Sequence, residues 1–276
     1  MQLIDFDSRF ADYLRGWIDT HEDEFENSDQ MEEQVPEVYQ TFLETPADWL
    51  GSVKPGEYFD GYSDSDALVR LMSLYIDRHI SVPDMLMNRL VEIGGESEKS
   101  LMALLDDEGA GNEKKMLAVS LLRELDSSLP MKRYIAWQYE REDEDELCDN
   151  AMESLEAMGE KARDAMLEAL EGASLAGKEA LLGALSRYPG DDRILEGLLR
   201  LIEARPDRLA ILAACLGRLG DARALPALNQ LAEDEGIRYL DYIELRSAIE
   251  ALGGEAPRRE FYGDSEYEAL FSTRSE

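Results

Sequence analysis

The residue types at 172–179 come close to a phosphate-binding loop. They read Gly-Ala-Ser-Leu-Ala-Gly-Lys-Glu, with two glycines before a lysine as in the nucleotide-binding motif. Two features argue against nucleotide binding. Glu179 stands where the motif has a magnesium-binding hydroxyl, and the preceding residues have the pattern of a helix rather than a strand. We therefore interpret the segment as a turn between helices that is rich in small residues.

Residues that bind metals or act as nucleophiles are scarce. The sequence has two histidines, His21 and His79, and two cysteines, Cys148 and Cys215, without a paired spacing. The two histidines are too far apart in the chain for a two-histidine zinc site on one helix, and a Ser-His-Asp triad has few possible members. We expect no metal, no cofactor and no catalytic residue, and hence a protein that is not an enzyme.

Acidic residues form three clusters, at 22–33, at Asp60, Asp64 and Asp66, and at 142–146. A loose calcium site is one interpretation of the middle cluster. It lacks the ordered ligand loop with a late bidentate glutamate, so a solvated loop is the better one. The run Glu-Asp-Glu-Asp-Glu at 142–146 is expected to open a helix, where negative charge complements the helix dipole.

The chain as a whole is strongly acidic. Its 276 residues include 61 Asp and Glu against 28 Lys and Arg, a formal net charge of −33. Such a chain repels the phosphate backbone, which excludes nucleic-acid binding through a basic face, and it favours a partner protein with a basic surface. Residues 1–15 lack an export signal, and the longest apolar run, 209–216, is too short to span a membrane. We expect a cytoplasmic protein without a membrane segment.

A repeat of 30 to 33 residues fills most of the chain. Residues eight and four positions before each expected turn are apolar in eleven of twelve cases, with Ser186 the exception. Residues eight and eleven positions after the first five turns are all apolar or aromatic. This spacing describes two short helices with facing apolar stripes, which cannot both be buried in a single hairpin, so we expect the hairpins to stack. The expected turns lie at Gly94, Asp126, Gly159, Gly190, Gly220 and Gly253.

The segments Leu216-Gly-Arg-Leu-Gly-Asp-Ala-Arg-Ala-Leu-Pro-Ala-Leu228 and Leu155-Glu-Ala-Met-Gly-Glu-Lys-Ala162 resemble short HEAT-like repeats of the phycobilisome-lyase type. The resemblance covers residues 82–253 and implies an all-α fold, an α-α superhelix of about six helical hairpins. It is less informative about function, because the family includes adaptors, lyases, hydroxylases and DNA-repair enzymes. The sequence lacks the repeated His-Glu pairs of the hydroxylases and the basic surface of the repair enzymes, and we identify no pigment-binding pattern.

Three parts follow from these patterns. Residues 1–65 form an aromatic-rich helical N-terminal cap, residues 66–253 the HEAT-like solenoid, and residues 254–276 a C-terminal tail or capping helix. Residues 1–62 contain eleven of the 22 aromatic residues and do not follow the repeat. Large aromatic side chains suit a lid over the open apolar end of a solenoid.

We expect helices at 6–20 and 33–44 in the N-terminal module, and a third at 66–80 with Ser63 or Ser65 as its N-cap. An alternative to the cap is a pocket for a ligand between this module and the first repeats. It would be lined by Trp49, Tyr58, Phe59 and Tyr62.

The function that these features favour is a non-enzymatic scaffold or adaptor that binds a basic protein through acidic faces of the second helices. Two alternatives stay open: a small-molecule binder or enzyme that uses the aromatic pocket, and a DNA-mimic protein. Nothing in the sequence fixes the oligomeric state. The carboxylates expected to face the partner are Glu140, Glu168, Glu171, Glu196, Glu203 and Glu233.

Overall fold

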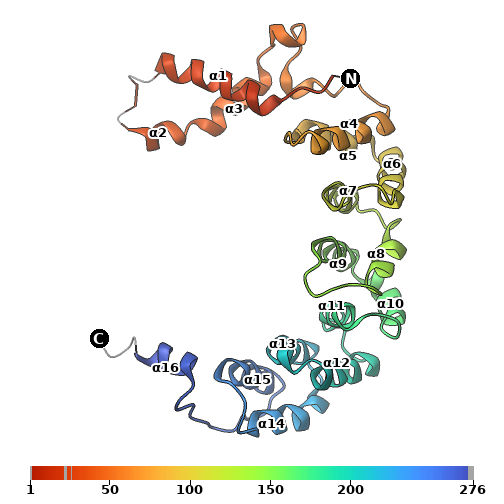
Figure 1. Cartoon of the computed structure of the whole chain (residues 1–276), viewed down its shortest axis with the longest axis vertical. Coiled ribbons are helices and arrows are strands. Elements are labelled where there is room, and N and C mark those ends of the chain that lie inside the picture. Colours follow the sequence, from red (N-terminus) through yellow and green to blue (C-terminus); the bar gives the residue numbers. More distant parts are fainter. Residues whose placement is uncertain (1, 22–23, 26, 273–276) are drawn as a thin grey trace. The chain divides into compact units, whose positions relative to one another are not determined.

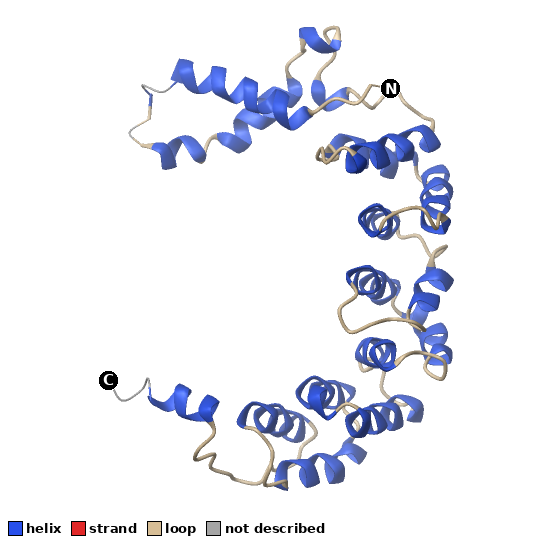
Figure 2. Cartoon of the chain, in the orientation of Figure 1, coloured by secondary structure: helices blue, strands red, loops and turns tan. Residues whose placement is uncertain are grey.

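The fold is all-helical. The computed structural model describes residues 2–21, 24–25 and 27–272. Within these residues there is no β-strand, and a single isolated bridge joins Ala47 and Val53 (Figure 2). No helix in the described part of the chain is both long enough and apolar enough to cross a membrane. The expected fold class is therefore confirmed at the level of an all-α protein.

The chain divides into two compact units, residues 1–130 and 131–276. Unit 1 contains seven α-helices and two short 3-10 helices among its described residues. Its elements are α1 (Phe6–His21), α2 (Ser28–Glu32), α3 (Val35–Glu44), η2 (Asp48–Leu50), η3 (Pro55–Glu57), α4 (Ser65–Asp77), α5 (Asp84–Ile93), α6 (Gly95–Asp106) and α7 (Asn112–Glu124).

In unit 2, consecutive helices belong alternately to two series. Helices α9, α11, α13 and α15 contact one another in succession, and α8, α10, α12 and α14 lie beside them (Figure 1). The elements are α8 (Met131–Trp137), α9 (Glu146–Met158), α10 (Glu160–Ala169), α11 (Leu175–Leu185), α12 (Asp192–Ala204), η4 (Pro206–Arg208), α13 (Leu209–Leu219), η5 (Ala222–Ala224), α14 (Leu225–Glu233), α15 (Tyr239–Ala251) and α16 (Ser265–Ser272).

All six expected turn residues have a positive φ, between 50° and 96°. Gly94 and Gly159 also have ψ values of −127° and −131°, and each is the only residue between two helices. Residues with a β-carbon avoid this combination, which makes glycine necessary there. Gly253 differs from the other turns, because residues 254–264 are not helical and α16 begins only at Ser265.

The apolar positions before the turns form the core. All twelve residues at the positions eight and four before a turn are buried, with at most 1% of their surface exposed. This includes Ser186, whose hydroxyl donates to the Gly183 carbonyl at 2.7 Å and accepts from Arg218 at 3.2 Å. The positions after the turns are less uniform, since Tyr134 and Leu198 are buried while Trp137 is only half-buried.

Two equivalent turns of unit 2 share one set of polar contacts. Asp191 and Asp221 each follow a turn glycine and accept a hydrogen bond at 3.0 Å from the backbone N–H two residues later. The side chain of that later residue, Arg193 or Arg223, also pairs with the carboxylate, at 2.7 Å and 2.6 Å. The repeat therefore extends from the apolar pattern to individual hydrogen bonds.

The N-terminal helices match expectation in part. Helices α1 and α3 lie where helices were expected, at 6–20 and 33–44, and the short helix α2, which was not expected, precedes α3. The prediction that Ser63 or Ser65 is the N-cap of the next helix, α4, is wrong. Asp64 caps α4 through a 3.0 Å bond from the Ala67 N–H, and the Ser65 hydroxyl instead lies 2.8 Å from that of Ser100. A carboxylate at the N-cap also complements the helix dipole.

Candidate functional site

Gly172 and Gly177 lie where neighbouring segments pack too closely to leave room for a side chain. A β-carbon at Gly177 would lie 2.0 Å from the Gln138 carbonyl oxygen, and one at Gly172 would lie 2.8 Å from the Tyr139 ring. The Gly177 N–H is bonded to the Ser174 hydroxyl at 3.0 Å, as part of the N-cap of α11. These contacts support the interpretation of the segment as a turn between helices.

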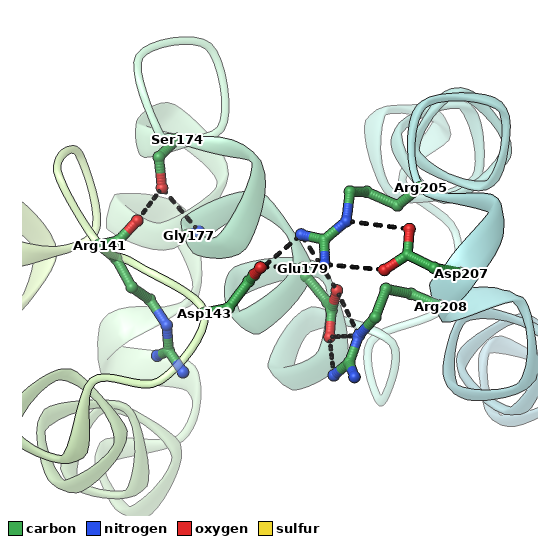
Figure 3. Close-up of polar contacts among 8 residues, drawn as sticks. All are labelled: Arg141, Asp143, Ser174, Gly177, Glu179, Arg205, Asp207 and Arg208. Atoms are coloured by element: carbon green, nitrogen blue, oxygen red, sulfur yellow. Dashed lines mark hydrogen bonds and ion pairs between the residues drawn. The ribbon is translucent and has the colours of Figure 1, made fainter.

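A network of arginines and carboxylates holds α11 against its neighbours (Figure 3). Arg208 donates to both carboxylate oxygens of Glu179, with distances of 2.6 to 3.1 Å. Arg205 donates to Asp143 at 2.9 and 3.3 Å and to Asp207 at 3.2 and 3.4 Å. The network thus joins the segment after α12 to α11 and to the loop before α9.

Hydrogen bonds to Asp207 and Asp143 raise the pKa of Arg205 above its ordinary value, so the guanidinium stays charged. Arg205 and Glu179 are each less than 15% exposed. On the other side of α11, the Ser174 hydroxyl donates to the Arg141 carbonyl at 2.7 Å (Figure 3). The start of α11 is therefore fixed in place, and with it the side chains that α11 presents on its other faces.

A groove of about 730 Å³ lies between α10, α11 and α12. Leu167, Leu182 and Leu201 line it and are buried, whereas Leu175, the first residue of α11, is 48% exposed. Gly197 of α12 also lines the groove. A β-carbon at Gly197 would come within 2.9 Å of the Leu182 side chain, so glycine lets α12 pack closely against α11 here.

The groove has charges of opposite sign on its two sides. Glu168 and Glu171 lie on the α10 side, and Arg193 and Arg200 lie on α12. The arginines are paired, Arg193 with Asp191 at 2.7 Å and Arg200 with Glu196 at 3.6 Å. The two glutamates are exposed and make no hydrogen bond or ion pair with any described residue. The hydrogen bond to Asp191 and, to a smaller extent, the charge of Glu168 raise the pKa of Arg193. Neither glutamate has a hydrogen-bonding partner among the described residues, so both carboxylates are available to a ligand.

The six glutamates expected to bind a partner are all exposed, but they do not form one site. Glu168 and Glu171 share the groove. Glu196 is engaged with Arg200, and Glu203 lies further along α12. The other two, Glu140 and Glu233, follow α8 and end α14.

Sequence reasoning missed the apolar and basic residues of the groove. Its floor consists of residues recognised only as core, and Lys178, Arg193 and Arg200 had no assigned role. One residue could have indicated the groove. Leu175 is a leucine at the exposed start of a helix, where a polar residue would ordinarily stand, and an exposed leucine beside other leucines marks a contact surface.

The aromatic residues expected to line a pocket in the N-terminal module pack against one another. Phe59 is fully buried, and its ring lies 4.9 Å from that of Tyr58 and 6.3 Å from that of Tyr62. Trp49 is separated from these by Phe6, whose ring lies 6.0 Å away. Trp49 also lines a smaller cavity of about 320 Å³, where the Arg9 guanidinium lies 5.0 Å from its ring centre.

The histidines and cysteines occupy structural or solvent-facing positions. The His21 ring stacks on Trp17 at 4.5 Å, and His79 lies exposed in a turn with a φ of 53°. Burial raises the pKa of the Cys148 thiol to about 12 and also raises that of Cys215, so both remain protonated and unreactive near neutral pH.

The acidic clusters do not converge on a metal position. Asp64 caps α4, and Asp66 accepts a hydrogen bond from Ser100 at 2.5 Å. No group of three or more possible ligands that could hold a metal ion occurs among the residues that the structure describes. Part of the cluster at 22–33, including Glu22, lies outside those residues. The run at 142–146 leads into α9, with Asp145 as the N-cap and Glu146 in the first turn, where negative charge complements the helix dipole.

Comparisons of the chain with family models, with curated proteins and with solved structures find no match. Evidence for a function therefore comes from the groove and from the charges around it.

Proposed function

We propose that the chain is a HEAT-like repeat protein that serves as a non-enzymatic scaffold for binding another protein. Three features support the repeat assignment: the positive φ at every expected turn, the buried positions before those turns, and the matching contacts of Asp191 and Asp221. In such a protein the helical hairpins stack into an α-α superhelix, and a long surface becomes available for a partner.

The proposed partner has a basic surface. The observation that carries this proposal is the position of Glu168 and Glu171, two unpaired carboxylates beside an open groove with a leucine floor. Residues 131–276 contain 32 acidic and 18 basic residues, so internal pairing cannot neutralise them. A lysine or arginine of a partner would gain a charge-assisted contact there, and the field of the unit would speed its approach.

Zero-length cross-linking tests this proposal directly. A carbodiimide joins a carboxylate to a lysine amine only where the two are in contact. With a lysate of the cells that make the protein, we expect the cross-links to concentrate at Glu168 and Glu171, with further ones at the other four glutamates, and to join lysines of one or a few proteins. Cross-links spread evenly over all exposed carboxylates would overturn the proposal.

A matched pair of variants distinguishes loss of the binding site from loss of negative charge in general. One variant changes the six glutamates at 140, 168, 171, 196, 203 and 233 to glutamine. The control removes the same charge from exposed carboxylates of unit 1, at Asp19, Glu32, Glu33, Glu44, Asp60 and Glu108. We expect loss of the cross-linked partner in the first variant and its retention in the second. Equal loss in both would mean that only net charge matters.

A further inference from the structure

The groove between α10, α11 and α12 follows one face of α12. Its lining residues on α12 run from Arg193 to Ala204 at positions 193, 197, 200, 201 and 204, which is the spacing of one helix face. The eleven steps from the first to the last of these residues cover roughly 16 Å of helix, which is about three turns. On α11, the lining residues Leu175, Lys178 and Leu182 follow the same spacing.

The groove also limits what kind of chain it can bind. An extended peptide gains affinity by adding to the edge of a β-sheet or, when rich in proline, by docking in an aromatic-lined groove. The described residues form no sheet, and the residues that line this groove include no aromatic one. A lipid tail needs an enclosed cavity, whereas this groove is open to solvent beside the half-exposed Leu175. A helix satisfies its own backbone hydrogen bonds and needs only an apolar stripe and matched charges.

We propose that this groove binds one amphipathic helix of a partner protein, about three turns long. Leucine-like side chains face Leu167, Leu182 and Leu201, basic residues on one flank face Glu168 and Glu171, and acidic residues on the other flank face Arg193 and Arg200. This inference rests on the proposed scaffold function and adds the form and charge pattern of the bound segment.

Fluorescence anisotropy with designed peptides tests the inference on the full chain. Three 14-residue peptides carry the same stripe of leucines, with flanks that are lysine and glutamate, lysine on both sides, or glutamate on both sides. A fourth replaces the leucines of the mixed peptide by glutamine. In 150 mM salt, where screening leaves mainly local contacts, we expect the mixed peptide to bind most tightly and the fourth not to bind.

Two substitutions with equal exposure locate the binding site. Leu175→Glu removes an apolar contact of the groove, and Leu240→Glu changes a leucine in the first turn of α15 that is also 48% exposed. Glutamate is favourable in the first turn of a helix, so both variants should fold, which circular dichroism and urea midpoints check. We expect Leu175→Glu to weaken the mixed peptide roughly tenfold and Leu240→Glu to leave it unchanged.

Charge reversal provides a second readout. In the variant Glu168→Lys with Glu171→Lys, both sides of the groove become basic, so the preferred peptide should change from the mixed one to the one with glutamate on both flanks. No change in preference would overturn the assignment of the two flanks.

Three other outcomes would overturn the helix-binding inference. In the first, the affinity of the peptides depends only on their number of lysines and Leu175→Glu does not change it. This would reject the groove as the binding site but leave the scaffold proposal standing. Displacement of the mixed peptide by oleate, with oleate binding abolished by Leu175→Glu, would identify a lipid site. Dimerisation of the chain that Leu175→Glu abolishes would identify a second copy as the occupant. If the mixed peptide binds tightly but the cross-linking experiment fails, the result counts instead against the proposal that the partner has a basic surface.

Discussion

Glycine at 177 is explained by one contact that few residues could tolerate. The Gln138 carbonyl, from the segment after α8, approaches α11 so closely that no side chain fits between them. In sequence this glycine looks like part of a phosphate-binding loop, and its spacing to Lys178 encourages that interpretation. The structure gives it a packing role, because its N–H already has a partner in Ser174.

We predict that Gly177→Ala destabilises the protein by about 1–3 kcal/mol, the usual range for overpacking. The clash is with backbone, which cannot move aside as a side chain can. Gly183, in the same helix, has no atom within 4 Å of the position that a β-carbon would take, so Gly183→Ala should stabilise by about 0.5–1 kcal/mol. Urea unfolding of both variants checks the prediction, and equal effects at 177 and 183 would contradict it.

At the scale of the element, capping decides where helices begin. Asp191 caps α12 and pairs with Arg193, and these contacts lower the pKa of its carboxyl. Because the folded state holds the charged form, the pair contributes stability above the ordinary aspartate pKa and loses it as the pH falls through the lowered pKa of the folded protein.

We predict that Asp191→Asn, which keeps the cap and removes the charge, lowers the free energy of unfolding at pH 6 but not below the lowered pKa. Asp191→Ala also removes the cap and should cost about 1 kcal/mol more at pH 6. Urea midpoints between pH 6 and pH 3 measure the difference from wild type. Asp60→Asn is the control, an exposed aspartate whose side chain makes no hydrogen bond or ion pair with described residues. A difference that does not shrink as the pH falls would reject the ion pair as its cause.

The elements were predictable where their determinants are local. A turn residue and the apolar positions four and eight before it lie within one hairpin, and these were predicted correctly in every repeat. The N-cap Asp64 was missed because serines on both sides of it are equally good caps in principle. After Gly253 the sequence predicts a tail or capping helix, and the structure has a non-helical segment, 254–264, followed by α16.

The candidate site was less predictable for a physical reason. Sequence periodicity shows which face of a helix is polar, but not which polar faces of two helices lie across a groove from each other. Glu168 and Arg193 belong to separate hairpins, and the pair Arg205 and Asp143 is 62 residues apart in the chain. Such contacts depend on how the hairpins stack.

At the scale of the whole molecule, charge repulsion competes with the many surface ion pairs. Exposed pairs contribute about 0–1 kcal/mol each, and salt weakens them. Salt also weakens repulsion among the excess carboxylates. Even if every lysine and arginine were paired, 33 negative charges would have no partner, so repulsion should be the larger effect.

We therefore predict that raising NaCl from 10 to 150 mM increases the urea midpoint of the protein. Over this range the screening length falls from about 30 Å to about 8 Å, which removes most of the repulsion between distant carboxylates but spares pairs in contact. The variant with six glutamates changed to glutamine has fewer excess charges and should show a smaller increase. Replacing NaCl by KCl controls for binding of a particular cation. A midpoint that falls with salt would mean that the ion pairs of this chain outweigh its repulsion.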